Sequence, residues 1–234
     1  MKVITIGDLH GKTHWKNISY DEYDRVIFIG DYLDGDGSTD ELENLQQIIS
    51  FKKSYPEKVI LLLGNHEIQY YWQPENKLKK HNRHLSKSFN SILKENENIF
   101  QVSFQLNDYL WTHAGITNRW LDFVENTVPG FKNSFASNPE ETINALFHSD
   151  KCDLLFSIGK AKGGDSTGGP FRADISELRT GIPLNIKQLT GHYRIKGIEK
   201  VEINSNEIIF TDCLNSTIEW AVLDPFSREL TILR

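Results

Sequence analysis

The chain has 234 residues, of which 38% are hydrophobic and 25% are charged, as in a globular domain with a sizeable core. We expect one domain over residues 1–234, without a linker or an internal repeat. The net charge of −6 disfavours a dedicated nucleic-acid surface, which would need an excess of Lys and Arg. The two cysteines form no CxxC pair, and no apolar stretch reaches membrane-spanning length. A cytoplasmic protein without a disulfide framework or membrane contact is therefore expected.

Five apolar runs along the chain each end in a turn that carries polar side chains. The runs are typical of buried strands: Lys2–Ile6, Arg25–Ile29, Lys58–Leu63, Tyr109–Trp111 and Ile186–Thr190. The polar residues that follow them are, in the same order, Asp8 and His10, Asp31, Asn65 and His66, His113, and His192. Because open α/β sheets bind ligands at the carboxyl ends of their strands, we expect these side chains to form one site.

A helix is expected between the second and third runs. Ser38 and Glu41 have the spacing of a capping box, and apolar residues at helical spacing continue to about Lys53. A helix placed between two strands predicts a β-α-β unit with neighbouring parallel strands. Further on, the polar and basic stretch 76–96 predicts one or two solvated helices.

The second half of the chain has a less regular pattern. Phe100–Leu106 and Tyr109–Thr112 predict a hairpin. Asn138 followed by Pro139 predicts a helix start, with Asn as the cap and Pro at the first helical position. The glycine-rich stretch Gly159–Pro170 lacks the ending of a nucleotide-binding loop, and we expect a mobile surface loop there. An antiparallel tail of strands is predicted by four further runs: Val201–Ile203, Ile208–Phe210, Glu219–Leu223 and Leu230–Leu233.

Six of the polar residues after the strands are of metal-ligand types: Asp8, His10, Asp31, Asn65, His113 and His192. This set is too large for one tetrahedral zinc ion and contains no sulfur. It suits two divalent ions, Mn²⁺ or Fe in the first place, with Zn²⁺, Ni²⁺ and Mg²⁺ as alternatives. Because one carboxylate can bridge two cations about 4 Å apart, Asp31, in the middle of the set, is expected to be the bridge.

The motifs occur in the order that marks the calcineurin-like metallophosphoesterases, over most of the chain from Gly7 to His192. They are Asp-Leu-His-Gly, Gly-Asp-Tyr-Leu-Asp, Gly-Asn-His-Glu, His-Ala-Gly and Gly-His. The chain resembles the phosphoprotein phosphatase branch of that family, including its bacterial and phage members. The resemblance implies an α/β fold with two packed mixed β-sheets flanked by helices.

The resemblance also implies a role for each motif residue. The first metal would be held by Asp8 and His10, the second by Asn65, His113 and His192, and both by Asp31. Asn65 would also contact the substrate. His66 resembles the general acid that protonates the leaving alkoxide, and Asp34 resembles the carboxylate that orients it. Attack by a metal-bridging hydroxide would then release phosphate in one step, without a covalent intermediate.

Two positions depart from the pattern of the branch. Gly35 stands where an Arg usually clamps the substrate phosphate, so a bidentate donor is missing there. Arg172, beside the glycine-rich stretch, is the expected replacement. Weaker candidates are Lys160, Lys162, Arg119 and Arg194. The second departure is Tyr193, where Thr commonly follows the last Gly-His. Both positions bear on substrate binding more than on metal binding.

The leading functional hypothesis is hydrolysis of phosphate monoesters, with a phosphorylated protein (phosphoserine or phosphothreonine) or a small phosphate ester as substrate. A nucleotide hydrolase acting on diadenosine polyphosphates or cyclic phosphodiesters is the alternative on the same metal pair. A metal-binding scaffold without catalysis is a third hypothesis, which His66 and Asp34 argue against. Loops such as Gly159–Pro170 determine substrate choice and leave the first two open.

Several residues near the motifs receive simpler interpretations. His81 and His84 lie among basic residues, which predicts a solvated face. Tyr70 is expected to serve packing, and Glu67 to be a structural hydrogen-bond acceptor. Asp36 and Asp212 remain open as residues that support the metal ligands.

Overall fold

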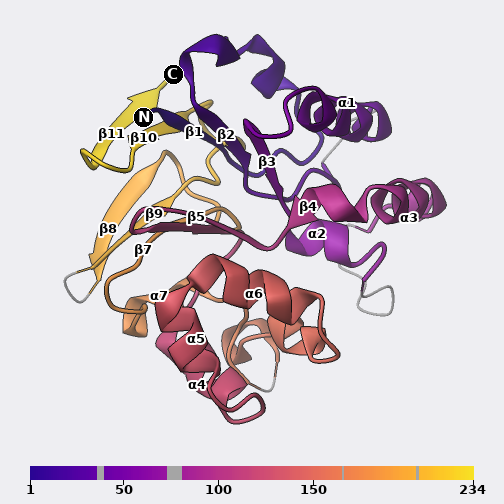
Figure 1. Cartoon of the computed structure of the whole chain (residues 1–234). Helices are drawn as coiled ribbons and strands as arrows, with labels where there is room; N and C mark the ends of the chain where they lie inside the picture. The colour runs from indigo at the N-terminus through magenta and orange to yellow at the C-terminus, as the bar shows by residue number, and fades with distance from the viewer. Residues whose placement is uncertain (36–39, 73–80, 165, 204–205) are drawn as a thin grey trace.

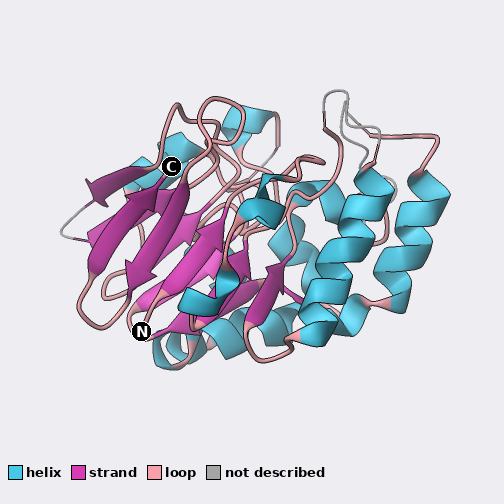
Figure 2. Cartoon of the chain, turned by 90° about the horizontal axis from the view of Figure 1, so that it is seen from above, coloured by secondary structure: helices cyan, strands magenta, loops and turns pink. Residues whose placement is uncertain are grey.

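Two β-sheets packed face to face form the centre of the protein, with helices outside them (Figure 1). The computed structural model describes residues 1–35, 40–72, 81–164, 166–203 and 206–234. Seen from above, most of the helices lie to one side of the strands (Figure 2). The arrangement confirms the predicted fold class of two mixed sheets flanked by helices. Within these described ranges, no helix combines the length and the apolar character needed to cross a membrane.

The first sheet has the strand order β11-β10-β1-β2-β3-β4. Its strands are β1 (Val3–Ile6), β2 (Arg25–Phe28), β3 (Val59–Leu62), β4 (Phe100–Gln101), β10 (Trp220–Asp224) and β11 (Glu229–Leu233). Strands β1 to β4 run parallel, whereas β10 pairs antiparallel with both β1 and β11. The predicted β-α-β unit is confirmed, because helix α1 (Glu41–Ser54) connects the parallel neighbours β2 and β3. The capping residue predicted at Ser38 lies outside the described residues.

The second sheet has the order β5-β6-β7-β9-β8. Its strands are β5 (Ser103–Leu106), β6 (Tyr109–Thr112), β7 (Lys187–Thr190), β8 (Glu199–Ile203) and β9 (Asn206–Phe210). Strands β6, β7 and β9 are parallel, and each edge is closed by an antiparallel hairpin, β5 with β6 and β8 with β9. The carboxyl ends of the parallel strands in both sheets therefore carry the turns that hold the predicted site residues.

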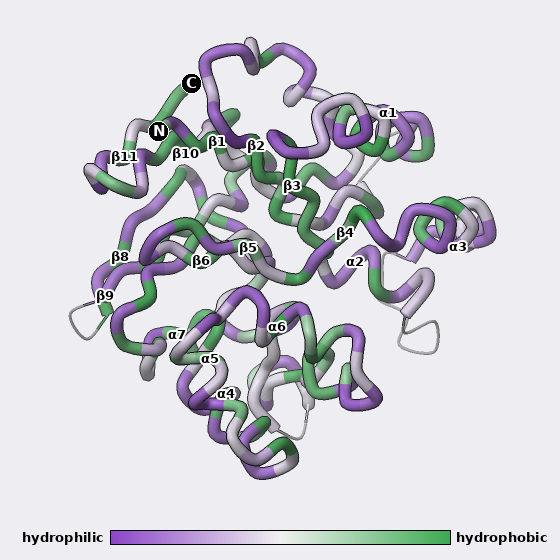
Figure 3. Tube along the Cα trace, viewed as in Figure 1, coloured by the Kyte–Doolittle hydropathy of each residue, from purple (hydrophilic) through white to green (hydrophobic). Residues whose placement is uncertain are grey.

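Alternate residues of the strands face different layers, as the pleat requires. In β1 and β2, Val3 and Ile27 belong to the layer between the sheets, where Trp111 and Leu189 meet them from the second sheet. Their neighbours along the strands face a layer of helices instead. Figure 3 shows β3 as hydrophobic, and β2 is hydrophobic after its first residue, Arg25. A strand with both faces buried is continuous in hydrophobicity, which is why its run was visible in the sequence.

Helices cover the outer faces of both sheets. On the first sheet, α1 contributes Leu45, Ile48 and Ile49 to the core, and α3 (Ser86–Glu95) contributes Phe89 and Leu93. The remaining helices are α2 (Asn65–Ile68), α4 (Asn118–Glu125), α5 (Phe131–Ser137), α6 (Pro139–Phe147) and α7 (Ile175–Thr180). As predicted, α6 starts at Pro139, and the Asn138 side chain accepts a hydrogen bond from the backbone N–H of Glu141. Short 3₁₀ turns occupy 14–17, 20–22, 97–99, 152–156 and 160–162.

Three sequence-based expectations need correction. The predicted strand Phe100–Leu106 is two strands in different sheets, because the chain crosses over at Val102. The predicted tail of strands is two hairpins, one in each sheet, and β9 pairs parallel with β7. Gly159–Pro170 is not a surface loop throughout, because its last residues, 167–170, are buried and hydrogen-bonded to residues such as Glu177. In the stretch 76–96, α3 buries two apolar side chains, and residues 76–80 lie outside the described part.

Candidate metal centre and active site

One group of side chains surrounds the Nε2 atom of His113, which stands just after β6. That atom lies 2.9 Å from Asn65 Oδ1, 3.2 Å from His192 Nδ1 and 3.4 Å from Asp31 Oδ2. These groups come from the turns after β6, β3, β7 and β2, so both sheets contribute. Two imidazole nitrogens, an amide oxygen and a carboxylate oxygen thus converge on one small volume.

A second group gathers on the same carboxylate oxygen of Asp31. His10 Nε2 lies 3.8 Å from Asp31 Oδ2, and His66 Nε2 lies 4.0 Å from it. Both groups have the spacing of metal-ligand sets, and Asp31 is their common member. Asp31 is therefore placed where a carboxylate shared by two cations would stand.

Asp8 lies beside both groups, although its carboxylate is turned toward the backbone of the last turn. Its Oδ2 accepts a hydrogen bond of 2.8 Å from the backbone N–H of His192. Its Oδ1 is buried and has no hydrogen-bond partner among the residues described. Gly191 permits this approach, because a Cβ there would lie 1.9 Å from Asp8 Oδ1. Five of the six residues predicted as ligands thus converge in the two groups, and Asp8 adjoins them through its hydrogen bond with the backbone of His192.

Two of the histidines are held in one tautomer by the backbone. The Nδ1 of His10 lies 2.9 Å from the carbonyl of Leu33, and the Nδ1 of His113 lies 3.0 Å from the carbonyl of Ile29. A carbonyl accepts only, so each Nδ1 carries the proton and donates it. Each Nε2 therefore presents a lone pair toward Asp31, which is the arrangement that metal-binding histidines require.

Left-handed backbone conformations recur in these turns. His10, Asp31, Asp34 and His192 have φ angles of +45°, +52°, +62° and +66°. Such angles are unfavourable for residues with a side chain, and they concentrate at functional sites where the surrounding structure holds them. Gly64 adds a close approach, since a Cβ there would lie 2.2 Å from Asp31 Oδ1. The side chains of these turns thus converge at the cost of unfavourable backbone conformations.

Glu67 fixes the backbone of the turn that carries Asp31. This fully buried carboxylate accepts backbone hydrogen bonds from Asp31, Tyr32 and Gly64, each 2.9 Å long. Burial and the nearby charge of Asp31 raise the pKa of Glu67 to about 7. The prediction that Glu67 is a structural acceptor is confirmed, and its effect is to fix the turn after β2 against the turn after β3.

His66 and Asp34 form a hydrogen-bonded pair at the edge of the site. The Nδ1 of His66 lies 2.8 Å from Asp34 Oδ2, so its Nε2 faces Asp31. Burial lowers the pKa of His66, but the charges of Asp31 and Asp34 and this hydrogen bond outweigh it and raise the pKa to about 9. The hydrogen bond with Asp34 therefore fixes the ring with Nδ1 on Asp34 and Nε2 toward Asp31.

Asp34 is itself fixed by three further donors that sequence reasoning did not assign to it. Gln69 Nε2 donates to it over 2.6 Å and the backbone N–H of Asn82 over 3.2 Å, and the hydroxyl of Tyr70 forms a short hydrogen bond with Oδ1. Tyr70 is buried, as predicted, but it has a polar contact in addition to packing. His81 was expected to be solvated and instead stacks on the Tyr70 ring, with 4.6 Å between the ring centroids.

Arg172 is buried, with 7% of its surface exposed, and its Nε and Nη2 find no hydrogen-bond partner in the described part of the chain. Burial lowers the pKa of its guanidinium, and the charge of Asp31 raises it, so the group lies within electrostatic reach of the site. Burying an unpaired guanidinium group costs folding free energy, and binding of an anion would offset that cost. The weaker candidates are all exposed: Arg119, Lys160, Lys162 and Arg194.

The residues present fit a pair of divalent cations. Three buried carboxylates, those of Asp8, Asp31 and Asp212, lie within electrostatic reach of one another, and burial followed by the Asp31 charge raises the pKa of Asp212 to about 6. The Oδ1 atoms of Asp8 and Asp212 have no partner within the described ranges. Oxygen and imidazole ligands of this kind suit metals such as Mn²⁺ or Fe, whereas metals that prefer sulfur ligands are disfavoured. Asp212 therefore lies within electrostatic reach of Asp8 and Asp31, whereas Asp36 lies outside the described residues.

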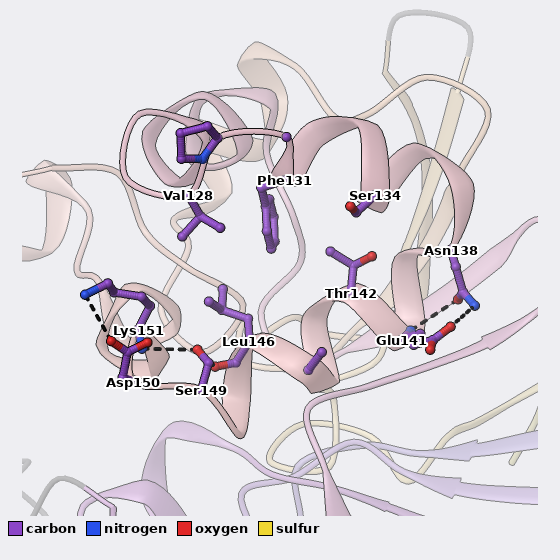
Figure 4. A pocket seen from close by; sticks show the side chains of 13 residues that line it. Val128, Phe131, Ser134, Asn138, Glu141, Thr142, Leu146, Ser149, Asp150 and Lys151 are labelled. Atoms are coloured by element: carbon purple, nitrogen blue, oxygen red, sulfur yellow. Dashed lines mark hydrogen bonds and ion pairs between the residues drawn. The ribbon is translucent and has the colours of Figure 1, made fainter.

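The protein surface has one hollow away from the site and another beside it. A groove of about 650 Å³ lies around α5 and α6, and Val128, Phe131 and Leu146 point into it (Figure 4). None of the residues that line this groove belongs to the metal-ligand groups. A second hollow of about 420 Å³ borders Asp34 and is lined also by Gly35, Glu41, His81, Asn82, Arg83 and His84. It borders the site on the side of Asp34, the residue that is hydrogen-bonded to His66.

Comparison with known proteins identifies the family. The family model described as calcineurin-like phosphoesterase matches residues 1–192. The chain therefore belongs to the calcineurin-like phosphoesterase family, as its motifs predicted. The match confirms the family that the order of the motifs predicted.

Individual relatives are similar over limited stretches. A Caenorhabditis elegans protein that bears the name of a serine/threonine-protein phosphatase is 30% identical over 139 residues, 54% of this chain and 30% of that protein. The catalytic subunit of serine/threonine-protein phosphatase 4 from Kluyveromyces lactis is 33% identical over 70 residues, 28% of this chain and 22% of that protein. The chain thus spans less than a third of the length of these relatives.

Solved structures with the same fold cover the whole chain. A cold-active protein-tyrosine phosphatase from a psychrophilic Shewanella species has a TM-score of 0.62 and 18% identity, over 99% of this chain and 77% of its own. A protein serine/threonine phosphatase from Saccharomyces cerevisiae has a TM-score of 0.59 and 15% identity, over 100% of this chain and 79% of its own. At these identities the likeness shows the shared fold.

Proposed function

We propose that the chain is a phosphomonoesterase that uses two divalent metal ions, Mn²⁺ or Fe in the first place. The observation that supports this most strongly is the position of Asp31, the one residue common to both ligand groups. Asn65, His113 and His192 would hold one ion together with Asp31. Asp8 and His10 would hold the other with Asp31, and His66, the third member of the His10 group, would serve as the proton donor instead. When bound, such a pair polarises a phosphoryl group and supplies a water with a pKa near neutrality.

The chain's own residues supply the remaining chemistry. The Arg172 guanidinium, buried and unpaired among the described residues, would bind the oxygens of the phosphoryl group. His66 would donate a proton from Nε2 to the leaving alkoxide while Asp34 holds its Nδ1–H. Asp34 is held in turn by Tyr70, Gln69 and Asn82, so the donor is fixed before substrate binds.

The proton-donating pair favours catalysis over a purely structural metal site. Metal binding alone requires neither His66 nor the four contacts that fix Asp34. We therefore favour an enzyme over a catalytically inactive metal-binding scaffold. A phosphorylated protein or a small phosphate ester is the proposed substrate, and a nucleotide hydrolase remains the alternative to be tested.

The test is hydrolysis by the purified, metal-loaded protein of four substrates: a phosphoserine peptide, p-nitrophenyl phosphate, bis(p-nitrophenyl) phosphate and diadenosine tetraphosphate. Phosphate release from the two monoesters, abolished by chelation and restored by Mn²⁺, is the expected result. Preferential cleavage of diadenosine tetraphosphate or of the diester would replace the proposal by the alternative. No hydrolysis of any of them, with two metals bound, would contradict an enzymatic role on these substrate classes.

A further inference from the structure

Lys162 and Tyr193 form a contact at the outer side of the metal-ligand group. Lys162 ends the short 3₁₀ turn Lys160–Lys162, and the backbone pairing of Gly159 with Ser166 closes the loop around it. Its Nζ atom makes a short contact with His192 Nε2 and lies 5.3 Å from the centroid of the Tyr193 ring. An ammonium at this distance from an aromatic ring is attracted by the negative face of the ring.

The ammonium of Lys162 has no carboxylate within 4.0 Å in the ranges that the structure describes. The Lys162 side chain is exposed, and its ammonium lies within electrostatic reach of the charges of Asp174, Asp31 and Arg172. The Lys162 and Arg172 cations therefore lie within electrostatic reach of each other and of Asp31. Two cations directed at one site without anionic partners are suited to a ligand that carries more than one negative charge.

Tyr193 connects this lysine to the rest of the site. The residue is buried, and its hydroxyl lies 2.9 Å from the carbonyl of Ala114 and 2.6 Å from that of Ala173. Ala114 follows His113, and Ala173 follows Arg172. One side chain therefore fixes the His113 turn and the Arg172 segment while its ring lies under the Lys162 ammonium. A threonine at this position is too short to do either.

The contact with His192 also depends on the tautomer of that ring. The Nδ1 of His192 faces His113 within the ligand group, and Nε2 faces Lys162. When Nδ1 provides the ligand lone pair, the ring proton resides on Nε2, which then cannot accept from an ammonium. The Lys162 ammonium then lies over the Tyr193 ring, and its N–H groups are available to another acceptor.

We propose that Lys162 is a second phosphate-binding cation, positioned by Tyr193, that takes the place of the arginine absent at Gly35. The proposal rests on the phosphomonoesterase function proposed above and deepens it. The two departures from the phosphoprotein phosphatase pattern are then linked, because the aromatic ring at 193 supports the lysine that compensates for Gly35. Arg172 and Lys162 would bind the phosphoryl oxygens from the same side of the site.

The experiment measures binding of inorganic phosphate to the metal-loaded protein by calorimetry, and its inhibition of turnover where turnover is found. Lys162→Ala should weaken phosphate binding by about 10–150-fold, since hydrogen bonds to charged groups contribute about 1.5–3 kcal/mol. Lys162→Arg should recover most of that loss. Lys94→Ala, which removes an exposed lysine of α3, is the control and should bind as the parent does. Metal content by elemental analysis should be unchanged in all three.

The role of Tyr193 is tested by two substitutions that separate its ring from its hydroxyl. Tyr193→Phe keeps the ring beside Lys162 and should retain the part of phosphate binding that Lys162→Ala removes. Tyr193→Thr should lose binding about as much as Lys162→Ala, and the two losses should not add in the double variant. A purely structural Tyr193 would give additive losses. Phosphate binding by Lys162→Ala equal to that of the parent, or no phosphate binding by the parent, would overturn the proposal.

These outcomes are distinct from failure of the proposed function. A parent protein that binds phosphate through Lys162 and hydrolyses no monoester would refute the phosphomonoesterase and leave the phosphate site standing. A parent that hydrolyses monoesters with Lys162→Ala unaffected would do the opposite.

Discussion

Arg172 and His66 are the two residues for which we propose different tasks on the same substrate. The first is a permanent cation without a partner in the described structure, and the second is a proton donor held by a carboxylate. Both were predicted as site residues from the sequence, His66 by its motif and Arg172 by its place beside the glycine-rich stretch, and both roles stay predictions. The contacts of Asp34 with Tyr70 and Gln69 could not be predicted, because the turn that brings them together leaves no periodic pattern.

Arg172→Ala should lower kcat/KM for a phosphomonoester by about 10–150-fold, the value of a charge-assisted hydrogen bond to phosphate. Metal content should not change, because no ligand is touched. Arg172→Lys should restore only part of the loss, since Lys cannot present two parallel donors. The control is Arg179→Ala, an exposed arginine of α7. Steady-state kinetics that show the parent's kcat/KM in Arg172→Ala would remove the residue from substrate binding.

His66→Asn should lower kcat by about 10²–10⁴-fold with near-normal metal content, as expected for loss of a general acid. The loss should shrink for p-nitrophenyl phosphate, because a good leaving group needs little protonation. The exposed residue His84 beside the same hollow provides the control variant His84→Asn. If the loss is equal for leaving groups of widely different pKa, His66 acts in another way.

At the scale of elements, the strand-to-turn units were predictable because apolar runs with both faces buried end at polar turns. The crossing between the sheets was not. Phe100–Gln101 and Ser103–Leu106 form one continuous run in the sequence, yet the chain changes sheet at Val102. What stabilises the crossing is Asn144 of α6, whose Oδ1 accepts from the N–H groups of Val102 and Ser103. Such a contact joins positions about forty residues apart and is invisible to local patterns.

Asn144→Ala should lower the free energy of unfolding by about 1–3 kcal/mol, because the backbone groups at the crossing lose their partners. The Asn144 side chain also donates to the carbonyl of Ser103 over 3.0 Å, so both ends of the amide are used. Urea unfolding monitored by circular dichroism measures the effect, with Asn133→Ala on the exposed face of α5 as the control. Equal stabilities of the two variants would show that other groups or water satisfy the crossing.

At the scale of the whole molecule, the site exists because two sheets meet with their ligand-bearing turns at one place. The packing is fixed by the apolar layer between the sheets and by a hydrogen bond of 2.9 Å from Trp111 Nε1 to Thr5 Oγ1. The sequence indicated which strands carry ligands, but not which sheet each strand joins. That choice depends on pairings across the whole chain, such as β1 with β10, whose partners Val3 and Leu223 are far apart in sequence.

The central claim is that Asp31 is shared by two metal ions, and its most direct test is the metal content of Asp31→Asn. Elemental analysis and calorimetric titration with Mn²⁺ should give two ions per chain for the parent and for the control Asp21→Asn, an exposed aspartate. In Asp31→Asn, the affinity for both ions should fall together and hydrolysis should be abolished, because the carboxylate common to both ligand groups is lost. Two tightly bound ions in an active Asp31→Asn protein would contradict the shared ligand and the dinuclear site built on it.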